Sequence, residues 1–588
     1  MIILGINDGH QSSAALIING KLVAAVAEER FTRRKNEHGY PEKAIEACLS
    51  ISGIKEKDIE HIAIATKSLP PSYFRIRRDS DFTIKDFWKE QKDYWYPTIY
   101  EKKQINYTEV FKDKDYEKNF VYDKNFIKHD LDSEGMRRAR EAYVSKKLNI
   151  DIKKISFHDH HEAHAYYGLL GKSPAIKDCL IYTADGFGDG YNASVWKLKN
   201  NQKLENILYT NNCHIGRMYR YSTLLLGMKP AEHEYKVMGL APYANPKFAN
   251  EAYKVYMETL QVNGLDFKYN KTPPDNFFYF KKKLEGERFD NIAYAIQKRT
   301  EELITLWIKN GIKLTGIKNV IFSGGVAQNI KANKKVIELS EIESFYVPPG
   351  PFDESLSVGA AFMAHKKLEE TTQVFFDNPY LGTGYNKKDI SIFIKENQES
   401  NITVKEVSLV KIASLLAKGE IIGWFNGRME FGSRALGARS IIANAKGTDA
   451  IKKINEQVKR RDFWMPFAPS ILSYRSKDYI INPKNIEAKW MTLGFDSTEL
   501  AQKDIKAALH PYDNTLRPNI VYKEDNKDYF NLITEFEKIT GVGAILNTSF
   551  NLHGEPVVES PQDAYSTFKR CGLKYLYLCG YLFTKSDK

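Results

Sequence analysis

A dense group of histidines is the part of this sequence best suited to metal chemistry. Four of the 13 histidines lie in the seven-residue segment His158–His164, which reads His-Asp-His-His-Glu-Ala-His. In a helix, residues four apart lie on one face, so His160 and His164 could bind one ion. His161 and His164, three apart, are the competing pair. The alternative is a solvated helix start that binds no metal.

Two aspartates could complete such a site. Asp185 follows an apolar segment and begins a glycine-rich turn, and Asp353 lies before Gly359-Ala360-Ala361. Both positions are expected at the ends of strands or helices, where functional sites are usually built. Two imidazoles with carboxylates suit Fe(II) foremost, with Mn(II) or Zn(II) as alternatives, and do not suit a thiolate metal.

A second kind of site is suggested by glycines between a strand and a helix. The segment 323–329, Ser-Gly-Gly-Val-Ala-Gln-Asn, has this character, and a helix N-terminus favours anions. Together with the acidic glycine turn at Asp185, it predicts an N-terminal actin-like ATPase or sugar-kinase fold. A Walker A motif is absent. The alternative is that the Gly-Gly pair only forms a tight turn.

Fixed cations and small polar residues gather in the C-terminal half. They occur in four segments: 428–440, 459–470, 510–517 and 546–551. The planar guanidinium group of arginine can donate two parallel hydrogen bonds to the oxygens of a phosphate or carboxylate. A single arginine of this kind would be interpreted as part of a surface salt bridge. Four such segments in one domain predict instead that the domain binds a polyanionic small ligand.

The elements that must position these residues are those of an α/β protein. Residues 2–31 predict a three-stranded meander with a hairpin turn at Asn19-Gly20. Later segments repeat the order strand, glycine turn, helix. We expect a first domain over residues 1–370, a boundary near 366–385, and a second α/β domain over residues 386–588. The aromatic region 68–145 is expected to be an insertion, either over a substrate cleft or as a peripheral cap.

Composition limits the classes of function. A chain of 588 residues with 43% hydrophobic and 27% charged residues predicts a folded protein of several domains. The net charge of +12 is spread widely, which favours a solvated basic surface over a nucleic-acid stripe. The spacing of the five cysteines does not predict a disulfide framework. The N-terminus does not predict a signal peptide, and no apolar run is long enough to predict a membrane span. We therefore expect a cytoplasmic protein.

Taken together, these motifs resemble the O-carbamoyltransferase family, typified by the nodulation and antibiotic carbamoyltransferases. The resemblance covers nearly the whole chain. It is carried by segments 3–16, 27–31, 160–164, 185–188, 234–241, 434–440, 467–470 and 547–556.

The resemblance implies a Kae1-like, actin-like N-terminal domain followed by a YrdC-like α/β domain. It implies metal ligation by His160, His164, Asp185 and Asp353. It also implies two chemical steps: carbamoyl phosphate and ATP, with Mg(II), give carbamoyl adenylate in the C-terminal domain, and the carbamoyl group then passes to a hydroxyl at the metal site. An adenylate supplies the leaving group that a carbamate lacks, and enclosure protects it from water.

Site residues follow from the same resemblance. His10 is the candidate base for the acceptor hydroxyl, because histidine exchanges protons near neutral pH. Nucleotide binding in the first domain is assigned to Lys236, Gly324, Gly325 and Asn329. Binding of carbamoyl phosphate and ATP in the second domain is assigned to Arg434, Lys459, Arg517, Asn547 and Ser549.

The chain departs from the family pattern at three positions. Gln11 stands where the family usually has Asp, Asn36 where it often has His, and Met465 where it usually has Arg. The last change removes a cation from the expected phosphate site, for which Arg460 or Arg461 would compensate.

The expected partners are carbamoyl phosphate, ATP and a hydroxyl-bearing small molecule or glycan, with a homodimer left open. Two alternatives are kept. One is threonylcarbamoyl transfer to tRNA, which the basic charge alone supports. The other is a non-catalytic nucleotide-binding protein of the actin-like class.

Overall fold

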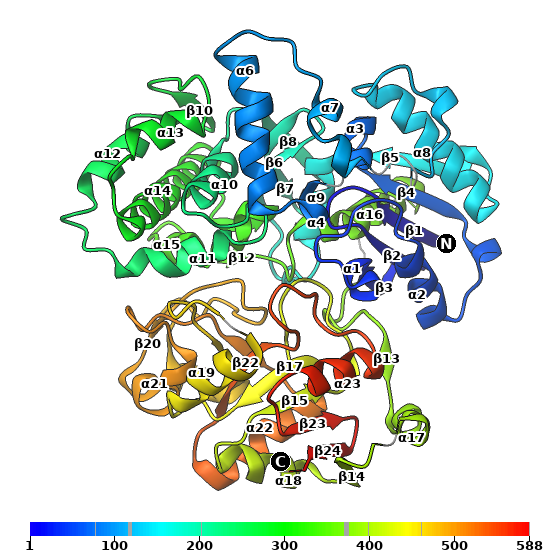
Figure 1. The fold of residues 1–588 in the computed structure, drawn as a ribbon, viewed down its shortest axis with the longest axis vertical. Helices are drawn as coiled ribbons and strands as arrows, with labels where there is room; N and C mark the ends of the chain where they lie inside the picture. Colours follow the sequence, from blue (N-terminus) through cyan, green and yellow to red (C-terminus); the bar gives the residue numbers. More distant parts are fainter. Residues whose placement is uncertain are drawn as a thin grey trace. The chain divides into compact units, whose positions relative to one another are not determined.

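The computed structural model of the chain describes residues 1–76, 78–115, 120–201, 203–369, 375–397, 399–459 and 461–586 (Figure 1). Arg460 and part of the expected domain boundary, residues 370–374, lie outside the described residues. The chain forms two compact units. The first comprises Met1–Glu28 and Asn36–Phe375, and the second comprises Glu29–Lys35 and Phe376–Lys588.

The short segment Glu29–Lys35 belongs to the second unit, and no sequence pattern predicted this membership. Two of its three arginines, Arg30 and Arg33, explain this placement. Arg30 donates to the carbonyl of Gly432 at 2.6 Å, and Arg33 donates to the carbonyls of Val557 and Pro556 at 2.6 and 2.7 Å. Buried guanidinium groups need such acceptors, so these contacts fix the segment to the second unit.

The first sheet of the first unit begins with the predicted meander. Its strands are β1 (Ile2–Asn7), β2 (Ser13–Ile18), β3 (Lys21–Ala27), β4 (His61–Ala65) and β5 (Ile155–His158). Their order is β3-β2-β1-β4-β5, with β1, β4 and β5 parallel. Asn19 and Gly20 have φ of 48° and 76°, as a two-residue hairpin turn of type I′ requires.

The second sheet has the same topology as the first. Its strands are β6 (Cys179–Gly188), β7 (Tyr191–Lys199), β8 (Lys203–Thr210), β11 (Asn319–Ser323) and β12 (Ser344–Tyr346), in the order β12-β11-β6-β7-β8. Each sheet is therefore an antiparallel meander whose first strand continues into two parallel strands. This repeated topology is that of the actin-like ATPase fold, as predicted.

Helices cover these two sheets and carry much of the site. They include α2 (Glu42–Ser52), α9 (His160–Leu169), α10 (Ile215–Leu225), α11 (Glu234–Leu240), α12 (Asn250–Met257), α14 (Phe289–Thr315), α15 (Ile330–Glu338) and α16 (Leu356–Glu369). Helices α9 and α16 pack against each other, with the rings of Tyr166 and Phe362 in edge contact at 5.3 Å. The two helices therefore hold the histidine segment beside the segment that begins at Asp353.

The aromatic region 68–145 is largely helical and has two small cores of its own. Its helices include α3 (Pro71–Ile76), α4 (Arg78–Asp81), α5 (Ile84–Lys89), α6 (Tyr96–Ile99), α7 (Tyr107–Val110) and α8 (Ser133–Leu148). One core also contains Leu224 of α10 and Phe277. The other is formed by Phe74, Tyr122, Met136 and Ala139. The expected insertion is thus anchored by apolar packing to the body of the first unit.

The second unit is built on one mixed sheet. Its strands are β14 (Ile402–Glu406), β15 (Ile422–Phe425), β17 (Arg439–Ala443), β18 (Ala468–Leu472), β21 (Asn519–Val521), β22 (Ala544–Ser549), β23 (Tyr575–Leu578) and β24 (Tyr581–Lys585). Their order is β14-β24-β23-β15-β17-β22-β18-β21. Helices α17 (Lys387–Glu396), α18 (Leu409–Ala417), α22 (Lys527–Thr540) and α23 (Pro561–Arg570) complete an α/β unit, in agreement with the predicted fold class.

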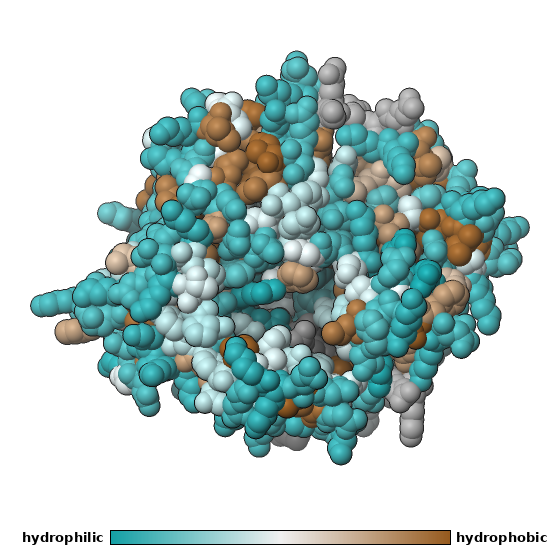
Figure 2. Space-filling model, turned by 90° about the horizontal axis from the view of Figure 1, so that it is seen from above, coloured by the Kyte–Doolittle hydropathy of each residue, from teal (hydrophilic) through white to brown (hydrophobic). Residues whose placement is uncertain are grey.

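Among the described residues, none of the helices combines the length and the apolar character needed to cross a membrane. On the face drawn in Figure 2, apolar residues form separate patches among hydrophilic ones.

Candidate metal centre

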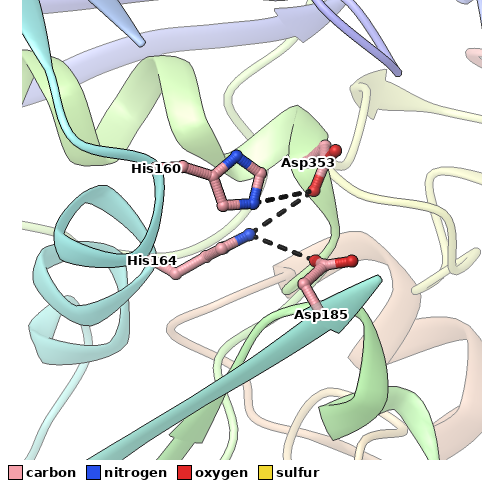
Figure 3. A group of neighbouring side chains, drawn as sticks. All are labelled: His160, His164, Asp185 and Asp353. Atoms are coloured by element: carbon pink, nitrogen blue, oxygen red, sulfur yellow. Dashed lines mark ion pairs between the residues drawn. The ribbon is translucent and has the colours of Figure 1, made fainter. Parts of the chain in front are cut away.

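Four predicted ligands from three distant segments lie together in the first unit (Figure 3). His160 and His164 are on α9, Asp185 is near the end of β6, and Asp353 begins the turn that leads into α16. One ligand atom of each residue lies within 4.8 Å of the others. Nε2 of His164 is 3.3 Å from Asp185 Oδ2 and 3.4 Å from Asp353 Oδ1, and Nε2 of His160 is 3.8 Å from Asp353 Oδ1.

The two imidazoles are oriented by hydrogen bonds on their far side. Nδ1 of His160 lies 3.2 Å from Thr66 Oγ1, and Nδ1 of His164 lies 3.3 Å from Ser355 Oγ. Both Nε2 atoms are buried, and among the described residues neither makes a contact with the geometry of a hydrogen bond. A buried polar atom normally has a partner. The donor set of two imidazole nitrogens and two carboxylates therefore fits a divalent metal ion.

The structure distinguishes between the two possible histidine pairs. Nδ1 of His161 lies 2.9 Å from Thr183 Oγ1, which is itself 2.6 Å from Ser194 Oγ. Burial is the main cause that lowers the pKa of His161 well below its usual value. His161 is therefore a neutral core histidine in this arrangement, and His160 is the partner of His164.

The electrostatics of the cluster favour a bound cation. Burial alone would lower the pKa of His164, but the carboxylates of Asp185 and Asp353 outweigh it and raise that pKa to about 9. The pKa of Asp185 moves in the opposite direction. Burial would raise it, but His164, His160 and the Gly325 amide lower it below its usual range. The Asp185 carboxylate is thus ionised and attracts positive charge, whether a proton or a metal ion carries it.

Two glycines are required by the geometry of this cluster. A Cβ on Gly188 would lie 2.2 Å from the ring of His160. Gly324 has φ of 88°, and a Cβ there would lie 2.4 Å from the carbonyl of Ala184. This turn delivers the amide of Gly325 to Asp185 Oδ2 at 2.9 Å. Gly324 and Gly325 therefore support a candidate metal ligand directly, and their assignment to a nucleotide stays a prediction.

The other residues assigned to the nucleotide in the first unit have structural partners. Asn329 caps α15 by accepting from the amide of Ala332 at 3.0 Å. Its side chain also exchanges two hydrogen bonds with Gln297, of 3.0 and 2.9 Å. Lys236 is buried on α11. A nucleotide would thus meet a preformed hydrogen-bond network here, and its binding stays a prediction.

The loop that carries His10 is joined to the metal cluster by a buried amide. Asn7 Nδ2 donates to the carbonyl of His10 at 2.9 Å and to the carbonyl of Asp353 at 2.8 Å. Asn7 is 1% exposed. The candidate base and one candidate ligand are therefore fixed to the same side chain, although 343 positions separate them in the sequence.

Sequence reasoning missed a buried ion pair beneath this site. Arg140 of α8 donates to both oxygens of Asp8, from Nε at 2.9 Å and from Nη2 at 2.5 Å, and both side chains are fully buried. Tyr122 OH also donates to Asp8, at 3.1 Å. Arg140 Nη1 donates to the carbonyl of Thr66 at 2.8 Å. The region 68–145 is therefore not a detached cap, because it supplies the arginine that supports the partner of His160. Asp8 precedes His10 by two residues, and this proximity was the available signal.

Most of the cations and polar groups predicted for the second unit gather at one edge of its sheet. Strand β22 ends there, carrying Asn547 and Ser549, while β17, β18 and β21 begin there. Arg434 precedes β17 by five residues and Arg517 precedes β21 by two, and both side chains are half-buried. Asn547 Nδ2 donates to the carbonyl of Ala435 and to Ser470 Oγ, each at 3.0 Å.

Lys459 lies at this edge and is 2% exposed. Its ammonium contacts the carbonyl and hydroxyl of Ser549 at 2.5 and 3.2 Å, and two oxygens of Asn551 at 3.0 and 2.5 Å. Within the described part of the chain, no carboxylate forms an ion pair with it. Burial, followed by the charges of Arg461 and Lys35, lowers the pKa of Lys459 well below its usual value. An anionic ligand would supply the missing negative charge. Met465, which stands where the family resemblance predicts Arg, is buried.

Comparison with known proteins agrees with this division of the chain. The carbamoyltransferase N-terminus model matches residues 2–362, and the carbamoyltransferase C-terminus model matches residues 413–585. An uncharacterized protein of Methanocaldococcus jannaschii is 30% identical, over 99% of this chain and 100% of its own length. The nodulation protein NolNO of Sinorhizobium fredii is 28% identical, over 98% of this chain and 79% of its own length.

Similarity to solved structures is much weaker. Full-length HypF in its phosphate- and nucleotide-bound form is 13% identical, with a TM-score of 0.32, over 63% of this chain and 56% of that one.

Because the two family models together span most of the sequence, the chain belongs to the carbamoyltransferase family and is an enzyme of carbamoyl transfer.

Proposed function

We propose that the protein is an ATP-dependent O-carbamoyltransferase that activates carbamoyl phosphate in its second unit and transfers the carbamoyl group to a hydroxyl in its first. The observation that carries this proposal is the set of two buried imidazoles and two half-buried carboxylates in a chain of this family. The buried ammonium of Lys459, which forms no ion pair with a carboxylate of the described residues, supports an anionic substrate in the other unit.

The first step prepares a poor electrophile for attack. Nitrogen donates electrons into the carbonyl of a carbamoyl group, so transfer needs a good leaving group. Water releases phosphate from carbamoyl phosphate, and the resulting carbamate oxygen attacks the α-phosphorus of ATP to give carbamoyl adenylate and pyrophosphate. Lys459 neutralises anionic oxygens, while Arg434, Arg517, Asn547 and Ser549 orient them.

The second step needs a base and a polarised electrophile. The acceptor hydroxyl attacks the carbamoyl carbon, AMP leaves with the electrons of the broken C–O bond, and His10 accepts the hydroxyl proton. His160, His164, Asp185 and Asp353 would hold a divalent ion, with Fe(II) as the first choice. When bound, such an ion polarises an oxygen of the adenylate. The acceptor is a hydroxyl of a sugar, a glycan or a natural product.

The two steps can be tested separately. The first is measured as carbamoyl-phosphate-dependent exchange of labelled pyrophosphate into ATP. The second is measured as AMP release with a panel of sugars as acceptors. Removal of metal with a chelator that is then dialysed away should abolish AMP release and preserve exchange, and added Fe(II) should restore release. Absence of exchange in the intact protein would refute the proposal.

Substitution of single histidines gives a matched comparison. His164→Gln removes a proposed ligand, whereas His161→Gln changes a neighbouring buried histidine that makes its hydrogen bond to Thr183. We expect His164→Gln to lose bound metal and transfer, and His161→Gln to keep both. Equal loss of metal from the two variants would contradict the ligand assignment.

A further inference from the structure

The side chain of Gln11 bridges two loops of the first unit. Its Oε1 accepts a hydrogen bond from the amide of Asp353 at 3.1 Å, and its Nε2 donates to Asn36 Oδ1 at 3.2 Å. Asn36 Nδ2 in turn donates to the carbonyl of Ala231 at 3.5 Å. Each amide accepts on one side and donates on the other. A directed chain of hydrogen bonds therefore runs from a candidate metal ligand to the loop before α11.

The three residues that these hydrogen bonds link to Asp353 have left-handed backbone conformations. Gln11, Asn36 and Ala231 have φ of 51°, 56° and 61°, in the left-handed region. This conformation is unfavourable for a residue with a Cβ, and less so for Asn than for Gln or Ala. Such strain persists only where surrounding contacts impose it, and it concentrates at functional sites. The side-chain bridge is one of the contacts that impose it on Gln11 and Asn36.

His10 lies next to Gln11, and its backbone is held by the same two loops. Its carbonyl accepts from Asn7, and His10 pairs with His38 in an isolated antiparallel bridge. The amide of Ser12 donates to the carbonyl of Glu37 at 2.9 Å. Loop 8–12 is thus held on one side by the segment 36–39 and on the other by Asp353. The side chain of Gln11 forms a hydrogen bond on each side, to Asn36 and to the amide of Asp353.

We infer that Gln11 and Asn36 are positioning residues that fix His10 relative to the metal cluster. This inference rests on the proposed function of His10. Neither amide needs to touch the substrate, because both act by holding loop 8–12 in its strained conformation. Without the bridge, Gln11 can relax to negative φ and carry the His10 backbone with it. A displacement of about 1 Å is enough to cost about 100-fold in rate.

The experiment uses water as the acceptor, because the natural acceptor is not identified. Water attacks the carbamoyl carbon, AMP leaves with the bonding electrons, the proton passes to His10, and carbamate is released. The rate of AMP release from carbamoyl phosphate and ATP then reports the second step. Pyrophosphate exchange in the same preparations reports the first.

A double-mutant cycle tests whether Gln11 acts through His10. We expect Gln11→Ala to lower kcat for AMP release by about 10- to 100-fold, with the KM for ATP unchanged. In a His10→Ala background the same change should have less than a twofold further effect, because no base is left to misplace. An undiminished effect of Gln11→Ala in that background would overturn the inference.

Two further variants separate positioning from general damage. Asn36→Leu breaks the bridge from its other end and should reproduce the loss, again only when His10 is present. Asn149→Ala is the matched control, because Asn149 is an exposed residue with φ of 48° at the C-terminus of α8. Like Gln11→Ala, it leaves alanine in the left-handed region. A similar loss of kcat in Asn149→Ala would show that backbone strain alone explains the effect and would refute the role of the bridge.

Failure of the underlying function would look different. If the unsubstituted enzyme shows no pyrophosphate exchange, the proposed function fails. If exchange and AMP release are normal and Gln11→Ala and Asn36→Leu retain full release, only the positioning role fails.

Discussion

Thr66 Oγ1 lies 3.2 Å from Nδ1 of His160, and Thr66 makes this contact with φ of 62°. A β-branched residue rarely adopts that conformation. Its carbonyl is held by Arg140 Nη1 at 2.8 Å, which explains how the strained backbone is maintained. The orientation of a candidate metal ligand therefore depends on a residue that lies 94 positions earlier and on an arginine of the inserted region.

Thr66→Val should weaken metal binding by about 10- to 100-fold, because it keeps the side-chain shape but removes the hydrogen bond to His160. Affinity is measured by competition with a chromogenic chelator. Thr66→Ser keeps the hydroxyl and should bind within about threefold of the unsubstituted protein. Equal affinities of the valine and serine variants would show that the hydroxyl does not orient His160.

Arg140→Met should destabilise the first unit by about 3–5 kcal/mol, because it leaves the fully buried Asp8 carboxylate without its partner. The measurement is the urea dependence of the unfolding transition of that unit. The double variant Asp8→Asn/Arg140→Met removes the uncompensated charge and should recover part of the loss. If the double variant is as unstable as the sum of the two single variants, the Asp8–Arg140 pair does not explain the effect.

The metal-free protein should lose stability as the pH rises toward about 9. The folded pKa of His164, about 9, exceeds the unfolded value of 6.5, so the folded state holds an extra proton between these values. The stabilisation is complete below pH 6.5 and is lost as the pH passes through about 9. Thermal unfolding of chelator-treated protein across this range measures it. His164→Gln should flatten this part of the profile.

Metal affinity should change in the opposite direction with pH. A metal ion must displace the proton of His164, so affinity should rise about tenfold per pH unit between 6.5 and 9. Calorimetric titration in buffers of different ionisation enthalpy also gives the number of protons released. A pH-independent affinity without proton release would argue that His164 is not a ligand.

Lys459→Met should lower pyrophosphate exchange by at least about 100-fold while leaving the metal content of the protein unchanged. Its ammonium is a buried cation at the sheet edge where the anionic substrates are proposed to bind, and loss of such a group is expected to cost about 10²–10³ in rate. Lys452→Met is the control, because Lys452 is an exposed lysine of the preceding helical segment. Retention of exchange in Lys459→Met would move the activation site elsewhere.

The sequence by itself determined features that depend on local spacing. Alternating apolar residues and Asn19-Gly20 specify the first meander, since strand period and turn chemistry are local properties. The spacing of His160 and His164 places both on one face of α9 for the same reason. The two family models, each matched over one part of the chain, were also accessible from sequence.

Tertiary structure decided which distant segments meet. Residue spacing left the choice between His160 and His161 open, and the packing of α9 beside β6 and α16 places His160 with His164, Asp185 and Asp353, as the family resemblance implied. The supports from Thr66, Ser355 and Arg140, and the bridge between Gln11 and Asn36, also come from other segments of the chain. The membership of Glu29–Lys35 in the second unit likewise follows from carbonyl acceptors about 400 or more positions away. Hydrogen bonds over such separations are set by sheet order and helix packing, which no local pattern records.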